Sequence, residues 1–458
     1  MRKNAIMRSV LILGISGIIA KSFDFCFKAF YSRYLGSEGM GLLSLGFSLH
    51  GIMLTFSTAG LGVAVSKITS EYLEKNNHIA VKRCMKSSVF GVCLLSLIVI
   101  FITLIFSKSI SKYVLHDERV GLSLLTLAPS VLFMGVSYCL KGYFYAARKT
   151  LAPASSEILE QCVKFICIWF FLRLFLPYGI EYGCAAVFLG ISAGEFSSCL
   201  YLSIIYMKTS RYGYISENEA EISQKQIVCK LLGVSIPSMV TSLCCSALRM
   251  EEEVLIVSSL ERGGLSHSAS VQSLGILRGM AIPLLVLPLT LLGSVMSLLV
   301  PEISRAGVCG KRLLKHRAIL IYKYGIFLGL IVGFIFFVFG GKISTAFYGT
   351  DEPSLLVTYL APLCPVMFID SLSCSILNGL GKQPRMLVFT LLDFTLRLSL
   401  IYFTLPAGGT AAYAVMTVIS NLFTCTLSFM SVWFLVFKDN ILSPVKLTKR
   451  RKCGIFKA

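Results

Sequence analysis

Long, continuous runs of apolar residues recur along the whole chain and are separated by short polar segments. Residues 89–106, 318–339 and 410–437 are examples. Each run is close to the roughly 20 residues that a helix needs to cross the hydrocarbon core of a bilayer. A membrane barrel would show short segments of alternating polarity instead. The pattern therefore predicts an all-α integral membrane protein.

The apolar runs divide the chain into about twelve predicted transmembrane helices. Their approximate ranges are 6–31, 40–66, 87–107, 120–145, 154–176, 180–207, 227–257, 272–300, 318–340, 355–381, 386–405 and 409–437. The first range follows a basic segment as a signal peptide does, but its apolar character continues past Lys21 and no small-residue cleavage site follows. We interpret it as an uncleaved first span.

The basic residues lie mostly in alternate loops between these spans. Only 14% of the residues are charged, yet the net charge is +20. Bases gather at the N-terminus, in the loops around residues 67–86, 148–149, 208–225, 305–317 and 382–385, and after residue 445. The other loops hold few of them. This bias places both termini in the cytoplasm, predicts contacts with anionic membrane lipids and makes nucleic-acid binding an unsuitable explanation of the charge.

Short sequence matches between the two halves indicate an internal duplication. Ser44-Leu45-Gly46 matches Ser273-Leu274-Gly275, and Leu127-Ala128-Pro129 matches Leu360-Ala361-Pro362. The separations are close to half the chain. Six spans in each half give both halves the same orientation, so the repeat is parallel. We expect an N-terminal six-helix lobe over 1–225, a C-terminal six-helix lobe over 226–437, a central cavity between them, and a basic cytoplasmic tail over 438–458.

Three charged residues lie on one face of the first span. Lys21, Asp24 and Lys28 are spaced at i, i+3 and i+7, which places them on the same side of a helix. Ionised side chains inside a membrane are costly and are expected to face a cavity or a partner. Asp24 can pair with either lysine and leave one net positive charge. The group is either a cationic cavity wall for an anionic headgroup or a structural ion triad.

A second group of candidate binding residues belongs to spans seven and eight. Arg249 and Glu253 are four residues apart and can form an ion pair. Arg278 lies early in span eight, and His50 in span two is at a similar depth. Each has a structural alternative: the glutamates that begin at Glu251 also suit a solvated helix end, and His50 also suits a hydrogen-bonded packing position.

A third group consists of two acid–base pairs at equivalent places in the two halves. Glu160 and Lys164 in span five match Asp393 and Arg397 in span eleven, each at i, i+4 spacing. Their duplication favours a structural role in the repeat, and the alternative is coupling to an ion. Lys141 and Asp370 are further lone charges within spans.

The sequence contains no pattern typical of an enzyme. It has no nucleotide-binding loop, no G-x-S-x-G nucleophile motif and no cluster with metal-ligand spacing. The 16 cysteines are scattered through apolar spans and are expected to be reduced, buried side chains. We therefore expect no catalytic residue, metal or cofactor, although a proton, a sodium ion or the membrane potential is a candidate driving force.

Two stretches resemble a known family. Tyr31–Glu71 begins YSRYLGSEGMGLLSL and ends GIMLTFSTAGLGVAVSKITSE, and Leu140–Gln161 reads LKGYFYAARKTLAPASSEILEQ. Both look like the stage V sporulation protein B branch of the polysaccharide transporters. This branch belongs to a superfamily that also contains multidrug and toxin extruders, O-antigen flippases and lipid II flippases. The resemblance extends over essentially the whole chain.

The resemblance implies two six-helix lobes in a V shape and the transfer of an undecaprenyl-pyrophosphate-linked saccharide across the membrane. In lipid II flippases, bases of spans one, two and eight line the cavity. Lys21, Lys28 and Arg278 lie in comparable spans of this chain, and His50 stands where a larger base is expected. Many members also have two further C-terminal spans beyond the twelve counted here.

The leading hypothesis is thus a flippase of a bacterial cell membrane that carries a lipid-linked saccharide or peptidoglycan precursor, with cell-wall synthesis proteins as possible partners. A cation-coupled multidrug efflux transporter is the first alternative, and it predicts an aromatic cavity with a dominant carboxylate. A non-transporting scaffold for envelope or spore-cortex assembly is the second, and it predicts that substitutions of cavity charges are harmless.

Overall fold

The computed structural model describes residues 2–211, 223–291, 303 and 310–438. Throughout these residues the secondary structure is helical, without any strand. Nine of the helices in this part of the chain are long and apolar enough to cross a membrane. The all-α, multi-pass membrane class is therefore confirmed, whereas the total of twelve spans stays a prediction.

The structure separates into two compact units. The first comprises residues 1–283 with 347–350, and the second comprises 284–346 with 351–458. Each is described by itself. This division follows spatial contacts, and the predicted lobe boundary near residue 225, the repeat and the parallel lobes stay predictions. The basic tail, Arg305 and most of the predicted join between the halves lie outside the described residues.

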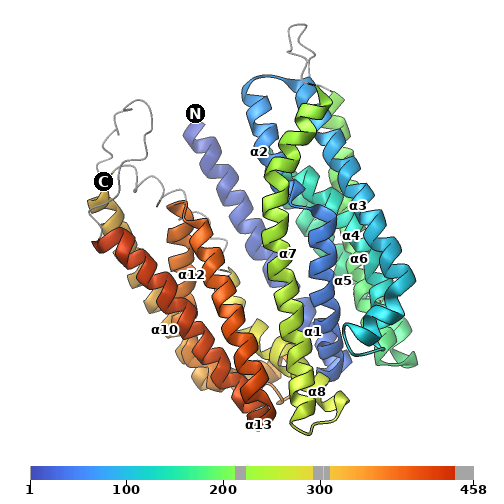
Figure 1. The fold of residues 1–458 in the computed structure, drawn as a ribbon, viewed down its shortest axis with the longest axis vertical. Helices are drawn as coiled ribbons and strands as arrows, with labels where there is room; N and C mark the ends of the chain where they lie inside the picture. The colour runs from blue at the N-terminus through green and yellow to red at the C-terminus, as the bar shows by residue number, and fades with distance from the viewer. Residues whose placement is uncertain (1, 212–222, 292–302, 304–309, 439–458) are drawn as a thin grey trace. The chain divides into compact units, whose positions relative to one another are not determined.

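The first unit is built from eight α-helices and two short irregular turns. The helices are α1 (Arg2–Thr58), α2 (Leu61–Glu74), α3 (His78–Tyr113), α4 (Val120–Ala146), α5 (Leu151–Phe175), α6 (Ile180–Arg211), α7 (Gln224–Arg262) and α8 (His267–Leu274); a 3-10 turn at Leu176–Tyr178 follows α5, and a π-helical turn at Gly275–Ala281 follows α8. Helices α3, α4, α5 and α6 lie side by side in Figure 1.

Glycine in a left-handed conformation divides the longest helix of the first unit. Gly36 has φ 66° and ψ −172° within α1, a region that side chains with a Cβ rarely adopt. The break lies between the first two predicted spans, so α1 contains the first span and most of the second. A second break at Ala59 and Gly60, with φ 44° and 70°, separates α1 from α2 inside the range predicted as the second span.

The second unit contains the remaining helices. They are α10 (Lys311–Tyr348, whose last two residues belong to the first unit), α11 (Ser354–Leu360), a 3-10 turn at Ala361–Leu363, α12 (Cys364–Gly379), α13 (Gln383–Val432) and a π-helical turn at Trp433–Lys438. Gly409, with φ 54°, breaks α13 between the last two predicted spans. Leu314, Tyr322, Leu372 and Ile376 belong to its buried core.

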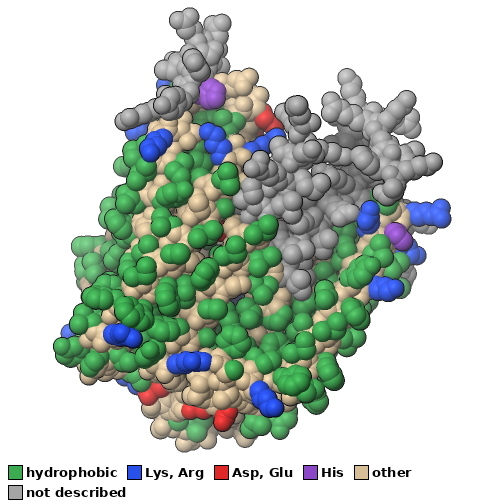
Figure 2. Space-filling model, turned by 180° about the vertical axis from the view of Figure 1, so that it is seen from behind, with side chains coloured by type: hydrophobic (Ala, Val, Ile, Leu, Met, Phe, Trp, Pro, Cys, Tyr) green, Lys and Arg blue, Asp and Glu red, His purple; other side chains and the backbone are tan. Residues whose placement is uncertain are grey.

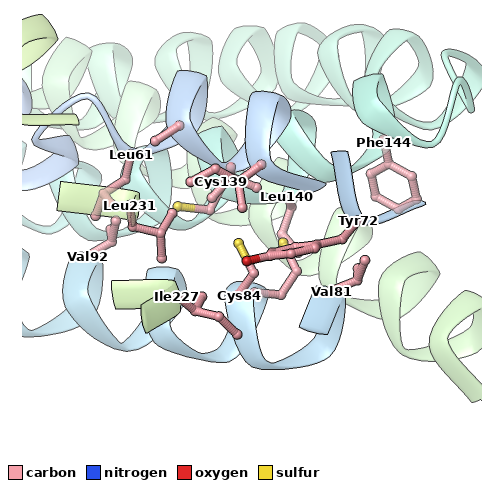
Figure 3. Packing of buried hydrophobic residues seen from close by; sticks show 14 of the residues in the cluster. Leu61, Tyr72, Val81, Cys84, Val92, Cys139, Leu140, Phe144, Ile227 and Leu231 are labelled. Atoms are coloured by element: carbon pink, nitrogen blue, oxygen red, sulfur yellow. The ribbon is translucent and has the colours of Figure 1, made fainter. Parts of the chain in front are cut away.

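A cluster of buried hydrophobic side chains joins the six helices α2 to α7 of the first unit. Figure 3 shows Tyr72 of α2, Cys84 of α3, Phe144 of α4 and Ile227 of α7 packed around it. Burying apolar surface in this way stabilises contacts between helices outside the membrane core, and close packing stabilises them within it. Helix α7 therefore belongs to one packed body with α2–α6.

The surface agrees with a membrane environment. Figure 2 shows one face on which hydrophobic side chains cover the broad middle, while Lys, Arg, Asp and Glu gather toward the upper and lower ends. Large exposed apolar side chains lie along α3, among them Phe90, Phe101 and Ile105. A contiguous apolar surface of this kind marks contact with lipid or another apolar partner.

Candidate substrate-binding site

The first candidate group is a charged face on α1. Lys28 Nζ lies 3.6 Å from the Asp24 carboxylate, and both side chains are partly exposed. Lys21 is exposed one turn earlier. On neighbouring turns, Phe27 stacks on Phe165 of α5 and Phe30 packs edge-on against the same ring, with ring centroids 5.1 and 5.5 Å apart. Aromatic packing thus fixes α1 against α5 while two lysines and one aspartate stay accessible, so this face carries one net positive charge.

The second candidate group joins α7 to the π-helical turn. Arg278 of the turn forms an ion pair with Glu252 of α7. Glu252 is only 2% exposed, whereas Glu251 is exposed and Glu253 is partly buried. The Glu253 carboxylate also interacts electrostatically with Arg278 and Arg249. Since two bases meet two acids here, this group contributes no net positive charge, and Arg278 is already engaged by a buried carboxylate.

Small residues position Arg278 by allowing a close approach of α1 to α8 and the turn. A Cβ on Gly275 would lie 1.8 Å from the Ser37 carbonyl oxygen, and one on Gly41 would lie 2.0 Å from the Val271 carbonyl oxygen. Only glycine fits where two helix backbones touch in this way. The π-helical turn itself adds a residue to the helical repeat, a feature common at functional sites.

His50 has different surroundings from the other candidates. Its side chain is 8% exposed, and its Nε2 lies 3.0 Å from the Ser130 hydroxyl of α4. It therefore occupies a position in the packing of α1 against α4. These contacts fit the alternative in which His50 is a hydrogen-bonded packing residue. A role in headgroup binding stays a prediction.

The acid–base pair of α5 belongs to a larger cluster of charges. Lys164 Nζ lies 3.4 Å from Glu160 Oε1. Lys141 of α4 lies 4.0 Å from the other Glu160 oxygen and 3.8 Å from Glu157. Glu195 of α6 is 6% exposed and lies within electrostatic range of Glu160 and Lys164. Three carboxyl groups and two ammonium groups therefore meet among α4, α5 and α6, and Lys141 is not a lone charge.

In the equivalent pair of α13, both charged side chains form a hydrogen bond with one serine hydroxyl. Arg397 Nε lies 2.9 Å from the Asp393 carboxylate and donates to the Ser420 hydroxyl at 2.6 Å. Ser420 in turn donates to Asp393. Asp370 of α12 accepts a 2.6 Å hydrogen bond from Ser428, so it is also not an isolated charge. Both predicted i, i+4 pairs form ion contacts, and their structural or functional roles stay predictions.

One end of the first unit carries an ion network that links three connections. Arg119 Nη1 lies 2.6 Å from Glu38, and its Nη2 lies 2.8 Å from Asp117. His267 lies 3.1 Å from Asp117 and 2.5 Å from Glu261. Burial alone would raise the pKa of Asp117, but hydrogen bonds from Arg119 and His267 hold this pKa below its ordinary value of 3.8. The network ties the α1 break, the α3–α4 loop and the α7–α8 turn together.

The other end of the first unit carries a basic pocket. It has a volume of about 800 Å³ and lies between the α2–α3 and α4–α5 turns. Arg148, Lys149 and His78 contribute basic side chains to its lining, and Glu74 contributes one acid. This end corresponds to the basic loops of the sequence, so the charge bias is a property of one end of the folded unit.

Sequence reasoning missed two buried acids, Glu252 and Glu195. Glu252 lies at i, i+4 and i, i+7 spacing from Ile256 and Ser259, which are also buried. Glu195 follows Phe188 by seven residues on a buried stripe of α6. Helical spacing from neighbouring buried positions was the available signal in both cases.

Comparison with known proteins decides the family. The family model described as "Polysaccharide biosynthesis protein" matches residues 6–306, more than half of the chain. The chain belongs to the polysaccharide biosynthesis protein family. A similar relative is stage V sporulation protein B of Bacillus subtilis (strain 168), 28% identical over 425 residues, with 91% of this chain and 82% of that protein covered. Sporulation protein YkvU of the same strain is 22% identical over 389 residues, covering 83% and 84%.

Solved structures place the chain in a known transporter fold. An inward-facing multidrug resistance MATE family transporter of the MOP superfamily has a TM-score of 0.71 at 14% identity, with 93% of this chain and 98% of that chain covered. A MOP superfamily transporter from Pyrococcus furiosus has a TM-score of 0.62 at 15% identity, covering 93% and 95%. This likeness shows the fold alone. Together with membership in the polysaccharide biosynthesis protein family, it indicates a membrane transporter rather than an enzyme.

Proposed function

We propose that this member of the polysaccharide biosynthesis protein family flips a lipid-linked saccharide or peptidoglycan precursor from the inner to the outer leaflet by alternating access. The carrier is undecaprenyl pyrophosphate or a lipid of the same chemistry. The observation that carries the proposal is the accessible face of α1, where Lys21 and Lys28 flank one carboxylate and leave a net positive charge inside a membrane-length helix.

The physical case rests on the cost of moving a charged headgroup through hydrocarbon. A pyrophosphate without a partner would lose its hydration, and the penalty for burying such a charge is prohibitive. Lysine ammonium groups replace part of that hydration by charge-assisted hydrogen bonds. The lipid tail needs no such help because it stays in the bilayer. A cationic face on a transporter helix therefore suits a substrate with an anionic head and an apolar tail.

Cation-coupled multidrug efflux is the second candidate, because the solved transporters of the same fold include multidrug transporters. Efflux of cationic drugs calls for a cavity whose net charge is negative or neutral. The α1 face has the opposite sign, while the group around Arg278 and Glu252 is neutral. The flippase is therefore favoured by the charge of the α1 face.

We also propose a bacterial cell membrane as the location, with both termini in the cytoplasm. The basic pocket beside Arg148 and Lys149 would then face the cytoplasmic leaflet. Anionic lipid headgroups attract basic residues near that surface. Contacts with cell-wall synthesis proteins are a further proposal, which follows from the substrate class.

The test is transbilayer movement of a fluorescent undecaprenyl-pyrophosphate-linked saccharide in liposomes that contain the purified protein. We expect movement with the wild type and a loss of at least about tenfold in the Lys21→Ala/Lys28→Ala variant, since two charge-assisted contacts are removed. The matched control is Lys75→Ala/Lys82→Ala, which removes the same charge from exposed positions at the α2–α3 turn and should flip at the wild-type rate.

A separate variant pair isolates the role of Arg278. Arg278→Ala leaves Glu252 buried without its base, so a loss of activity has a structural explanation as well. The double variant Arg278→Gln/Glu252→Gln keeps the site neutral, and a loss there identifies Arg278 as a headgroup contact. No saccharide movement by a folded wild type, combined with drug efflux, would replace the proposal with the second candidate; inactivity toward both would favour a scaffold.

A further inference from the structure

A four-residue segment at the end of α10, Phe347–Thr350, belongs to the first unit and is called the docking segment below. The Phe347 ring packs edge-on against Phe25 of α1 with ring centroids 5.0 Å apart. The Phe347 carbonyl accepts a 2.8 Å hydrogen bond from Arg33 Nε of the same helix. Gly349, with φ 75°, ends α10 in a conformation that residues with a Cβ rarely adopt. The docking segment is thus held against the helix that carries the charged face.

Tyr348 joins the docking segment to the π-helical turn. Its side chain is fully buried, and its hydroxyl donates a 2.9 Å hydrogen bond to the backbone carbonyl of Met280. Its ring also lies 6.5 Å from that of Phe25. A buried tyrosine hydroxyl needs a polar partner, and a donor that reaches a helix carbonyl from outside the helix depends on the position of that carbonyl. Tyr348 therefore connects α1 to the turn that carries Arg278.

The π-helical turn has a register that can change. Its wider hydrogen bonding is present where the Ile282 N–H donates to the Leu277 carbonyl, five residues earlier. A π-helical turn holds one residue more than an α-helical turn, and the extra residue can occupy different places along a helix. Successive residues of an α-helix are rotated by about 100°, since about 3.6 residues form one turn. Moving the extra residue past Arg278 would therefore turn this side chain by about 100°.

The packing of the turn favours one direction for Arg278. Gly279 is pressed against α1, since a Cβ there would lie 2.8 Å from the Cβ of Met40. Arg278, the preceding residue, extends to α7 and forms its ion pair with Glu252. Glu252 is 2% exposed, so a rotation of Arg278 would take this base away from a buried carboxylate, which is costly. The hydrogen bond from Tyr348 holds a carbonyl two residues further on and stabilises the same register.

The direction of Arg278 matters for the substrate that is proposed above. A guanidinium binds a phosphate group through two parallel N–H bonds in a fixed planar arrangement. Such a contact forms only when the plane of the guanidinium faces the phosphate oxygens, so a small rotation of the side chain weakens it. A lysine has no such plane and tolerates rotation better. Of the candidate bases, Arg278 is therefore the one whose binding depends most on a fixed backbone.

We propose that Tyr348 is a positioning residue of the candidate headgroup site. Its hydroxyl fixes the register of the π-helical turn and thereby the direction of Arg278. Tyr348 acts through Arg278 and does not touch the substrate, because its side chain is buried between α1 and the turn. The importance of Arg278 for a pyrophosphate headgroup rests on the proposed function, whereas the effect of Tyr348 on the turn rests only on the geometry of the first unit.

Hydrogen–deuterium exchange of the full-length protein in detergent tests the effect on the turn without any substrate. Tyr348→Phe keeps the ring and removes the hydroxyl, so exchange of the amides of Gly275–Ala281 should accelerate by about fivefold, the effect of one lost hydrogen bond. Exchange in α3 should keep its wild-type rate, which shows that the fold is intact. The matched control is Tyr322→Phe, because Tyr322 is a buried tyrosine of the second unit whose hydroxyl lies 2.8 Å from that of Ser373. Unchanged exchange of the turn in Tyr348→Phe, or equal acceleration in Tyr322→Phe, would overturn the proposal.

Binding of the fluorescent undecaprenyl-pyrophosphate-linked saccharide in detergent then tests the positioning of Arg278. Tyr348→Phe should raise the Kd by about fivefold, and Tyr322→Phe should leave it unchanged. In the Arg278→Gln/Glu252→Gln background, where the lysines of α1 keep binding measurable, Tyr348→Phe should have no further effect, because residues that act through one another are not additive.

Equal effects of Tyr348→Phe on the Kd of the wild type and of this background would overturn the positioning role, because Tyr348 would then act independently of Arg278. A wild type that does not bind the saccharide but shows faster exchange of the turn in Tyr348→Phe would overturn the proposed function. The effect of Tyr348 on the π-helical turn would then stand by itself.

Discussion

Two acid–base pairs at equivalent positions of the sequence have different surroundings in the folded protein. Glu160 and Lys164 of the first unit lie in a cluster with Lys141, Glu157 and Glu195. Asp393 and Arg397 of the second unit share the hydroxyl of Ser420. The first pair thus lies among three further ionisable side chains, whereas the second shares a hydroxyl and has Asp370 within electrostatic range.

This difference separates the two roles that the sequence left open. A guanidinium is always charged and holds a carboxylate in a fixed geometry, so the Asp393–Arg397 pair suits a structural contact. Lys141 and Lys164 lie among three carboxyl groups, so the Glu160–Lys164 pair suits coupling to an ion. If the halves arose by duplication, one copy of the pair kept the structural task while the other gained a changeable charge.

The largest effect is expected from removing the base of the structural pair. Arg397→Met removes the base that lies 2.9 Å from the buried Asp393 carboxylate, and losing one partner of a buried pair costs about 3–5 kcal/mol. Lys164→Met should cost less, about 1–3 kcal/mol, because Lys141 stays 4.0 Å from Glu160. Thermal unfolding in detergent measures both.

Arg385→Met is the control for this comparison, because Arg385 is exposed on the same helix as Arg397 and its loss should leave stability nearly unchanged. Equal costs for Lys164→Met and Arg397→Met would show that the first pair is as rigidly structural as the second. The distinction between the two units would then be lost.

A smaller effect is expected from separating α5 and α6. Gly194→Ala places a methyl group 3.0 Å from backbone and side-chain atoms of α5, and overpacking of this kind costs about 1–3 kcal/mol. Thermal unfolding in detergent measures this cost. Gly233→Ala is the matched control, since nothing lies within 4 Å of a Cβ there. A Gly194→Ala protein as stable as the wild type would contradict the packing argument.

The fold class could be predicted from the sequence because it follows from the length of the apolar runs. Apolar runs near the membrane thickness leave few architectures, and breaks at Gly36 and Gly409 fall between predicted spans. The break at Ala59 and Gly60 was missed because it lies inside an apolar run. Hydropathy does not respond to a left-handed backbone in such a run.

The contacts of the candidate site were harder to predict from the sequence, because the partner of each charged side chain depends on which helices pack together. Neighbours four residues apart, such as Asp24 and Lys28, were identified from spacing alone. The contacts of Lys141 with α5 and of Glu195 with Glu160 join different helices, and spacing along the chain carries no such information. Arg278 shows the same limit, since its partner Glu252 was grouped with a solvated helix end until packing showed it buried.

The smallest effect is expected at the ion network around Asp117, which lies in a loop. Asp117 itself is buried, but Arg119 and Glu38 of the same network are partly exposed. The pKa of Asp117 in the folded protein is below its ordinary value of 3.8. Its stabilising contribution is therefore fully present above that value and is lost as the pH falls through the folded-state pKa. Arg119→Gln removes the main cause of the depression and should cost about 1 kcal/mol at neutral pH.

The cost of Arg119→Gln should shrink as the pH falls through the folded-state pKa of Asp117, because the Asp117 carboxylate becomes protonated. High salt should also reduce it, since the Arg119 and Glu38 side chains are 28% and 30% exposed and ions screen such charges. The costs of Arg397→Met and Lys164→Met should change less with salt, because the side chains of these two pairs are only 10–21% exposed. Unfolding midpoints of the three variants at low and high salt measure this. A salt-insensitive Arg119→Gln cost would mean that the loop network is as well shielded as the two helix pairs, and that exposure to water is not what distinguishes them.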